Sequence, residues 1–234
     1  MTTQTLSTPP VSTAGTTATT TRIGAGFGIA AVVLLMAGFA LIASADAVHT
    51  NSAESIVGFY SDGSQTTKYA GGLISCVGLL MLLPFIATMA GRVHGSDPSV
   101  DLTGATARMA GAAYVVLCLP SQAAGAAALW LGAHGGDASS IVALNAMRAF
   151  TYYSAMLALA CFLVAVGAGG LAGGRLARWM SWSALVIGAT LAIGVAVAQT
   201  GLADIASLLV LAWIVAVSVG LLRRPEAVPA SDRG

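Results

Sequence analysis

Charge is the scarcest property of this sequence. Asp, Glu, Lys and Arg make up 8% of its 234 residues, whereas 57% are hydrophobic. A soluble domain carries about a quarter charged residues, so the composition excludes an ordinary soluble fold and indicates an integral membrane protein. The formal net charge is +1, and Lys and Arg form no basic block. These two features exclude a surface that binds nucleic acid.

Cysteine and histidine are also few, and their positions exclude several kinds of site. Three cysteines lie in apolar runs without CxxC spacing and are interpreted as small packing residues: Cys76, Cys118 and Cys161. Three histidines lie in polar segments, which leaves no pair inside a bundle to bind haem: His49, His94 and His134. No HExxH, GxSxG or Walker motif occurs. The GAGFGIAA stretch resembles the GxGxxA motif of dinucleotide-binding proteins, but it opens an apolar run and follows no strand. We therefore predict no catalytic residue, no metal and no cofactor.

Six apolar runs are each long enough to cross a bilayer, which takes about 20 residues. They cover residues 23–44, 69–90, 107–133, 141–170, 179–199 and 202–222. The links are short except between the first two runs, so successive helices are expected to lie antiparallel as neighbours. The third and fourth runs exceed the required length and are expected to tilt or project from the hydrocarbon. The sequence thus predicts an all-α fold, an integral membrane six-helix bundle spanning residues 23–222.

The flanking segments are polar and have little to bury. Residues 1–22 contain ten threonines and are predicted to form a disordered cytoplasmic tail, and residues 223–234 a short cytoplasmic one. Ala43-Ser44-Ala45 resembles a signal-peptide cleavage site. The apolar run before it is longer than the usual 7–15 or so residues, and five further spans follow, so an uncleaved first helix is favoured.

Basic residues set the expected orientation. With a cytoplasmic N-terminus, only Lys68 and Arg148 fall outside, and the other basic residues fall inside: Arg22, Arg92, Arg108, Arg175, Arg178, Arg223, Arg224 and Arg233. The positive-inside rule then places both termini in the cytoplasm. Four aromatic residues would mark the two interfaces, Trp130 and Tyr69 outside and Trp179 and Trp182 inside. The excess of Arg over Lys, with abundant Ala and Gly, is typical of GC-rich bacterial coding, so we expect a bacterial cytoplasmic (inner) membrane.

One ionisable residue lies well inside an apolar run, Arg148 in the stretch LNAMRAFTYYSAM. A guanidinium within a membrane is unfavourable unless it snorkels, pairs or faces water. Asn145 and Tyr152, at i−3 and i+4, share its helix face. The functional interpretation is a polar binding site open to the outside, formed by Arg148, Tyr152, Asn145 and Gln122. The structural alternative is a fixed ion pair or a snorkelled side chain.

Gln122 belongs to the stretch LPSQAAG in the third run. Pro120 has no backbone N–H to donate, so it is expected to kink the helix and free a carbonyl near Val116. Ser121 and Gln122 would then satisfy backbone groups or line a cavity. Broken helices at mid-membrane mark transporter sites, but they come in matching pairs, and no partner for Pro120 occurs here. A simple kink is therefore the alternative.

The polar segment between the first two runs is regularly patterned. Asn51 is placed to cap a short helix that has Glu54 at its third position. One apolar face follows, made of Ile56, Val57, Phe59 and Tyr60, before Ser61-Asp62-Gly63 turns the chain. We predict an amphipathic helix that forms an outer lid, whose key residues are Glu54, Phe59, Tyr60 and Asp62. In the sharper version Glu54 or Asp62 pairs with Arg148, and in the plainer one the helix only protects the bundle.

The same segment carries a resemblance. The pattern Ile56-Val57-x-Phe59-Tyr60, a polar turn and the helix YAGGLISCVGLLMLLPFIATMAGRV resemble uncharacterised small bacterial multi-pass membrane proteins grouped under a domain of unknown function. The resemblance covers about the first half of the chain. It implies the six-helix layout and a membrane location, and it lends no activity and no functional residue.

Two classes of function fit these features. A non-enzymatic structural, accessory or sensing protein fits the polar loop and the scarcity of buried charge. A small-molecule transporter or permease component fits the six spans, Pro120 and Arg148. Ion-coupled transport usually needs an intramembrane acid, and the only candidate, Asp204, lies at a helix end, so we expect the first class. A water-accessible cavity joining Arg148, Tyr152, Gln122 and Gln199 would favour transport, whereas a dry bundle would count against it.

The expected partners are the lipid bilayer and, through faces of small residues, another membrane protein or a second copy of the chain. Such small-xxx-small spacings let helices approach closely, and they occur at Gly24/Gly28, Gly169/Gly173 and Gly188/Ala192.

Overall fold

The structure, a computed structural model, describes residues 14–42, 52–93, 98–173, 176–197 and 202–223. Within these ranges the chain is all-helical, with seven helices: α1 (Ala14–Ile42), α2 (Ala53–Ser61), α3 (Gln65–Val93), α4 (Pro98–Ala133), α5 (Ala138–Gly173), α6 (Arg178–Ala196) and α7 (Leu202–Arg223). Six of them are long and apolar enough to cross a membrane. The predicted all-α fold, with six spans and a short helix after the first, is therefore confirmed.

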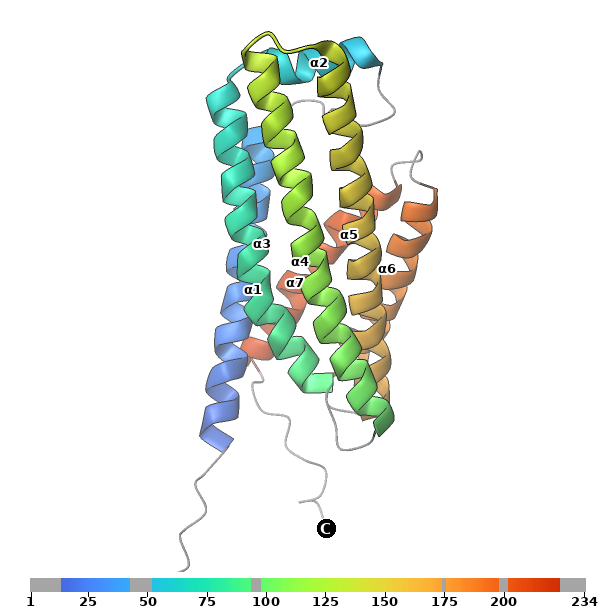
Figure 1. Cartoon of the computed structure of the whole chain (residues 1–234). Coiled ribbons are helices and arrows are strands. Elements are labelled where there is room, and N and C mark those ends of the chain that lie inside the picture. The colour runs from blue at the N-terminus through green and yellow to red at the C-terminus, as the bar shows by residue number, and fades with distance from the viewer. Residues whose placement is uncertain (1–13, 43–51, 94–97, 174–175, 198–201, 224–234) are drawn as a thin grey trace, which may run out of the picture.

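The six long helices form a ring. Going round it, α1 packs on α3, α3 on α4, α4 on α5, α5 on α6, α6 on α7, and α7 again on α1. In Figure 1, α7 passes behind α4 at a slant, and α1 begins and α7 ends at the same end of the ring. The short helix α2 lies across the opposite end. We call α2 the lid helix and the end that it covers the lid end.

Two helices are longer than a bilayer needs. α4 and α5 have 36 residues each, roughly 54 Å at 1.5 Å per residue, against about 30 Å of hydrocarbon. They therefore tilt or project, as expected from their long apolar runs. α4 begins at Pro98, before its apolar run, because Pro is favoured in a first turn and Asp101 lies at the positive end of the helix dipole.

The first helix also begins before its apolar run. α1 starts at Ala14, so residues 14–22, which the composition assigned to the disordered tail, are helical. Once a span is helical, each further residue adds one hydrogen bond without a new nucleus. The extension is tied to α3, since Arg92 Nη2 donates to Thr21 Oγ1 at 3.0 Å. Arg223, the first residue of the predicted C-terminal tail, is the last residue of α7. Residues 1–13 and 224–234 and the Ala43-Ser44-Ala45 site lie outside the described residues.

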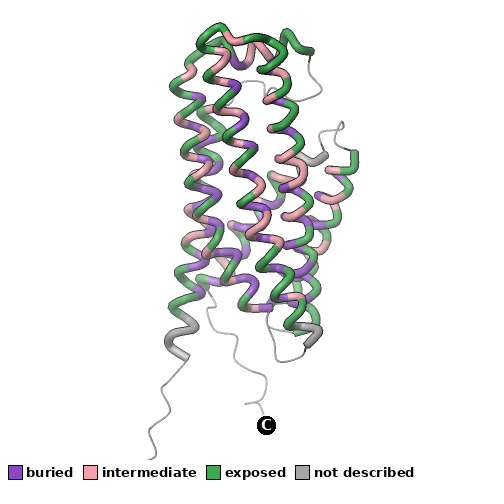
Figure 2. Tube along the Cα trace, in the orientation of Figure 1, coloured by how far each residue is buried: buried purple, intermediate pink, exposed green. Residues whose placement is uncertain are grey.

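Burial divides each long helix into an inner and an outer face (Figure 2). The inner core includes Phe85, Phe162 and Trp213, and Trp213 Nε1 donates to Ser183 Oγ at 3.0 Å, which joins α7 to α6. Large apolar side chains are exposed on the outside of all six long helices, including Val33, Val77, Val116, Phe150, Val186 and Leu209. Trp130, Tyr69, Trp179 and Trp182 are exposed as well. This pattern fits lipid contact, and the chain is a multi-pass membrane protein.

Small residues let neighbouring helices of this chain meet. A Cβ on Gly38 of α1 would lie 2.7 Å from the carbonyl oxygen of Gly71 in α3. Four glycines of the predicted small-residue spacings also face helices of the same chain: Gly24, Gly28, Gly169 and Gly188. These contacts close the ring, and a partner protein or second copy that uses such faces stays a prediction.

Candidate functional site

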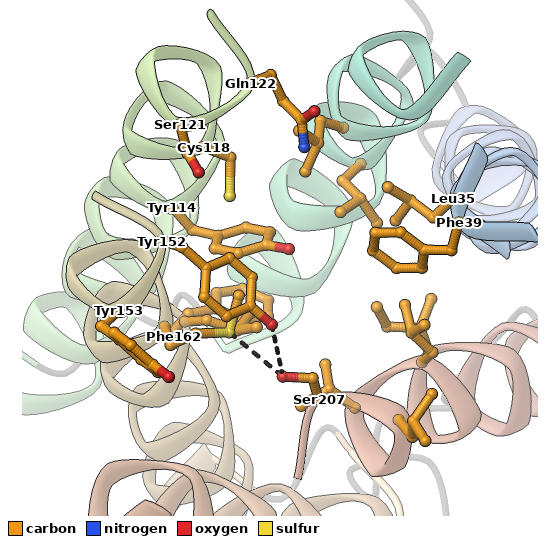
Figure 3. Close-up of a pocket in the computed structure, with 18 of the residues that line it drawn as sticks. Leu35, Phe39, Tyr114, Cys118, Ser121, Gln122, Tyr152, Tyr153, Phe162 and Ser207 are labelled. Carbon is orange, nitrogen blue, oxygen red and sulfur yellow. Dashed lines mark hydrogen bonds between the residues drawn. The ribbon is translucent and has the colours of Figure 1, made fainter. Parts of the chain in front are cut away.

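A cavity of about 390 Å³ lies inside the ring, and we call it the inner cavity. Five helices line it, mostly with apolar side chains such as Leu35, Phe39, Leu79, Leu82, Phe85, Phe162 and Trp213. Polar lining residues include Ser121, Gln122, Arg148, Tyr152 and Ser207. In Figure 3 the rings of Tyr114 and Tyr152 point into this space, and the Tyr152 hydroxyl lies 3.3 Å from Ser207 Oγ. An apolar pocket with a few polar groups is the usual form of a small-molecule site.

A second cavity, of about 270 Å³, lies beneath the lid helix, and we call it the lid-side cavity. Phe59 and Tyr60 of α2 line it, together with Lys68 of α3 and residues of α4. Three residues line both cavities: Ile42, Gln122 and Arg148. The two cavities therefore adjoin at Gln122 and Arg148.

Arg148 occupies this junction because of its place on α5. Its Nε donates to Asn145 Oδ1 at 3.4 Å, the i−3 contact that the sequence spacing predicts. Its backbone carbonyl accepts from Ser121 Oγ at 2.9 Å, which ties α4 to α5. Gly125 makes room for the side chain, since a Cβ there would lie 3.2 Å from Arg148 Cδ. α4 runs on as one helix through Pro120.

Asn145 joins the lid helix to Arg148. It is fully buried, and its Oδ1 also accepts from the Tyr60 hydroxyl at 3.0 Å. An arginine has only donors, so the Asn145 atom that faces Arg148 is the carbonyl oxygen. Asn145 Nδ2 is buried with no hydrogen-bond partner among the described residues. An unpaired buried amide is unfavourable by about 1–3 kcal/mol, and the two bonds to Oδ1 hold the side chain in place against that penalty.

The C-terminal end of the lid helix is fastened by α3. Lys68 Nζ donates to the backbone carbonyls of Phe59 and Asp62, the latter at 2.8 Å, and lies 4.4 Å from the centre of the Phe59 ring. Gln65 Nε2 donates to the carbonyl of Tyr60 at 2.8 Å. Cations stabilise helix C-termini because the last carbonyls lack helical partners.

The apolar face predicted for the lid helix is the face that packs. Ile56 and Tyr60 are buried against Ala128 of α4 and Ile141 of α5. The predicted cap is corrected: Ser52 caps α2, its Oγ accepting from Ser55 N at 3.2 Å, and Asn51 lies outside the described residues. Ser and Asn are equally good caps, so the sequence offered two neighbouring choices.

The acids of the lid helix are exposed. Glu54 lies in its first turn, and Asp62 follows its last residue. One connection from the lid helix to Arg148 runs through two neutral side chains, Tyr60 and Asn145. A direct ion pair of Glu54 or Asp62 with Arg148 stays a prediction.

Asp137 starts α5 at the lid end. Its carboxylate accepts from the Ser139 amide at 2.9 Å, the Ser140 amide at 3.2 Å and both serine hydroxyls. These hydrogen bonds, first that of the Ser140 hydroxyl and then those of Ser139, lower the pKa of Asp137 to about 2. The start of the helix that carries Arg148 is therefore capped by a charged carboxylate.

The structure brings together Arg148, Tyr152 and Gln122 on the inner cavity, with Asn145 beside them. Gln199 and the side chain of Asp204 lie outside the described residues. Sequence reasoning missed the cavity-lining roles of Lys68, Tyr114, Cys118 and Ser207. Lys68 follows a polar turn and was used only for orientation, and the other three have the spacing of ordinary core residues.

Among the residues that the structure describes, no group of three His, Cys, Asp or Glu side chains is arranged to hold a metal ion. No protein-family model, curated protein or solved structure matches the chain. The resemblance to multi-pass proteins of unknown function stays a prediction, and function is argued from the geometry.

Proposed function

We propose that this chain is a non-enzymatic sensing or accessory protein of a membrane that binds a small ligand inside its helix ring. The observation that carries the proposal is the position of Arg148. It lines both cavities and is linked through Asn145 to Tyr60 of the lid helix. A ligand that contacts the guanidinium therefore acts on the same hydrogen-bond network that holds the lid. The exposed side of α2 passes the change in lid position to a partner.

The packing at the end of the ring opposite the lid favours a protein that binds its ligand over one that lets the ligand pass through. Side chains from four helices fill it and are buried there: Met89, Ala90, Val93, Val166, Met180 and Leu221. The inner cavity thus has packed layers on one side and a short helix on the other. A ligand enters and leaves at the lid end.

A small-molecule transporter or permease component is the second candidate. The convergence of Arg148, Tyr152 and Gln122 on one cavity inside the ring favours it. Transport further requires that the packed end opens in another conformation, because alternating access exposes one site to each side in turn.

The native cysteines provide the test. Cys118 lines the inner cavity, Cys76 the lid-side cavity, and Cys161 is exposed on the outside of the ring. We would keep Cys118 alone, replacing the other two with alanine, and add a charged methanethiosulfonate reagent to sealed vesicles of either orientation. Reaction is expected from the lid side only. Tyr60→Phe should speed it about fivefold, the factor that corresponds to one lost hydrogen bond of about 1 kcal/mol.

A protein with Cys161 alone is the matched control, and its slow reaction in lipid should be the same with and without the Tyr60→Phe substitution. Cys118 labelling from both sides would favour transport. A labelling rate that Tyr60→Phe leaves unchanged would contradict control of the cavity by the lid helix.

A further inference from the structure

We infer that the ligand is an anionic amphiphile with a single apolar chain, whose acidic head lies at Arg148 and Lys68 and whose chain fills the inner cavity. The inference rests on the proposed function, because it names the ligand class of the same two cavities. Three features of the lining carry it: the sign of its charge, the arrangement of its polar groups and the apolar surroundings of the ring.

The charge of the lining has one sign. Lys68 and Arg148 line the lid-side cavity, Arg148 also lines the inner one, and no Asp or Glu is among the described residues that line either. Asp62 is exposed and lines neither cavity; its backbone carbonyl accepts from Lys68 Nζ, and its carboxylate also interacts electrostatically with Lys68, so Arg148 is the main cation of the head site. A guanidinium has five N–H donors and suits a carboxylate or phosphate head. Away from bulk water, such a pair of cations favours an anion strongly.

The charged and amide side chains are gathered at one end. Gln122 and Arg148 stand where the two cavities meet, beneath the lid helix. Further into the ring the lining is mostly apolar and its polar atoms are neutral hydroxyls. The apolar residues include Leu79, Leu82, Phe85, Phe162 and Trp213, and the hydroxyls belong to Tyr114, Tyr152 and Ser207. The volume of about 390 Å³ falls within the range of roughly 300–1,000 Å³ of small-ligand pockets. A charged head at the junction with a chain pointing away from the lid matches this gradient.

The apolar surroundings decide which part of the ligand gives selectivity. A hydrocarbon chain gains little on moving from lipid into an apolar cavity, because both environments are apolar. Discrimination must therefore come from the head. An acid should bind and a neutral alcohol of the same chain should not, which separates this ligand from membrane lipid that enters by chance.

Trp213 is placed to report occupancy. It lines the inner cavity and is only 4% exposed, whereas Trp130, Trp179 and Trp182 lie on the outside of the ring. We would replace these three with Phe and reconstitute the protein in phosphatidylcholine nanodiscs. Dibromooctadecanoic acid, ionised at the chosen pH, should quench Trp213 saturably. Half-maximal quenching should need a concentration of dibromooctadecanol at least about tenfold higher than that of the acid. This ratio corresponds to a difference in binding free energy of about 1.4 kcal/mol.

Charge variants test the head site. Arg148→Gln should weaken the acid at least tenfold and leave the alcohol unchanged, and Lys68→Gln should weaken the acid about threefold. Arg92→Gln is the matched control, because Arg92 is half-buried at the end opposite the lid. Should Arg148→Gln fail to fold, Arg148→Lys keeps the charge and is expected to keep the preference for the acid.

The outcomes separate the two proposals. Equal, saturable quenching by acid and alcohol would leave the cavity a binding site but overturn the anionic head. Displacement of the acid by inorganic phosphate would show that a free anion suffices and would overturn the amphiphile. Quenching by neither probe beyond its partition into lipid would overturn both the ligand class and binding in the cavity. An Arg92→Gln effect equal to that of Arg148→Gln would also overturn the assigned head site.

Discussion

At the scale of single residues, Asn145 shows how a buried amide links two parts of the molecule. One oxygen accepts from a residue of the lid helix and from the arginine at the cavity junction. Such a shared acceptor couples its two donors, because a change in either bond alters the charge available to the other. Tyr60 and Arg148 are far apart in sequence, so this coupling exists only in the folded ring.

Tyr60→Phe should lower the stability of the fold, because it removes the hydroxyl that donates to Asn145 and keeps the aromatic side chain otherwise unchanged. A lost hydrogen bond with one buried partner left behind is unfavourable by about 1–3 kcal/mol. For a chain of this size, each 1 kcal/mol lowers the midpoint of thermal unfolding by about 2–4 °C. Unfolding in mild detergent is the measurement, with the exposed Tyr69→Phe as control. Equal midpoints for Tyr60→Phe and the unmodified chain would contradict the bond.

Asp137 gives a pH dependence with a definite sign. Its pKa falls from a usual value of about 3.9 to about 2 in the fold. The charged cap therefore stabilises the fold fully above pH 4 or so, and this contribution is lost as the pH falls through the folded pKa. Asp137→Asn keeps a capping side chain that does not titrate. The unmodified chain should lose thermal stability relative to this variant on acidification, and a constant difference between the two would refute the role of the carboxylate.

Part of the site could be predicted at this scale. The i−3 and i+4 spacings placed Asn145 and Tyr152 on the helix face of Arg148, because helical periodicity is a local property. Lys68 was not recognised as a cavity residue. Its contacts with the carbonyls of Phe59 and Asp62 depend on the fold of the turn between α2 and α3, which the spacing of residues does not reveal.

At the scale of elements, the position of the lid helix depends on a glycine. A Cβ on Gly132 of α4 would lie 2.4 Å from the carbonyl oxygen of Tyr60 and 2.7 Å from its carbonyl carbon. Both atoms belong to the backbone of α2, so a side chain at this position requires the whole helix to move. Glycine is thus the residue that allows α2 to rest on α4.

Gly132→Ala should displace the lid helix and lower the free energy of unfolding by about 1–3 kcal/mol, as overpacking usually does. Labelling of Cys118 should be faster in the same variant, because the lid helix no longer packs closely against α4. Gly26→Ala is the matched control, since Gly26 lies in α1 with open space around it. That change should be neutral or stabilising by up to about 1 kcal/mol. Equal effects of the two substitutions would show that the approach of Tyr60 does not matter.

Elements were easier to predict than their ends. The apolar runs fixed the number of spans because each must be about a bilayer long. The start of α1 at Ala14 and the cap at Ser52 were missed, since helices propagate into neighbouring polar residues and adjacent polar side chains cap equally well.

At the scale of the whole molecule, closure of the ring creates the site. The inner cavity is lined by residues of α1, α3, α4, α5 and α7, including Leu35 of α1 and Ser207 of α7. Contact between α1 and α7 joins the two ends of the chain. No local pattern encodes such a closure, because it depends on how all six helices tilt. The sequence therefore indicated that Arg148 needs polar or aqueous surroundings, and the folded ring provides the two cavities that Arg148 lines.

The orientation of the ring in the membrane is the last prediction. α1 begins and α7 ends opposite the lid helix, and most described arginines belong to helix segments at that end: Arg22, Arg92, Arg108, Arg178 and Arg223. Lys68 and Arg148 belong to the lid half. Because positive residues are retained in the cytoplasm, we expect both termini there and the lid helix outside.

Fusion of a fluorescent protein after Gly234 should therefore fluoresce in bacterial cells, and alkaline phosphatase inserted between His134 and Gly135 should be active. These two residues lie in the lid-end turn between α4 and α5. The same phosphatase fused after Gly234 is the control and should be inactive. The reverse pattern would place the lid helix in the cytoplasm, and the ligand at Arg148 would then have to come from inside the cell. The topology thus decides which compartment the lid helix faces, whatever the identity of the ligand.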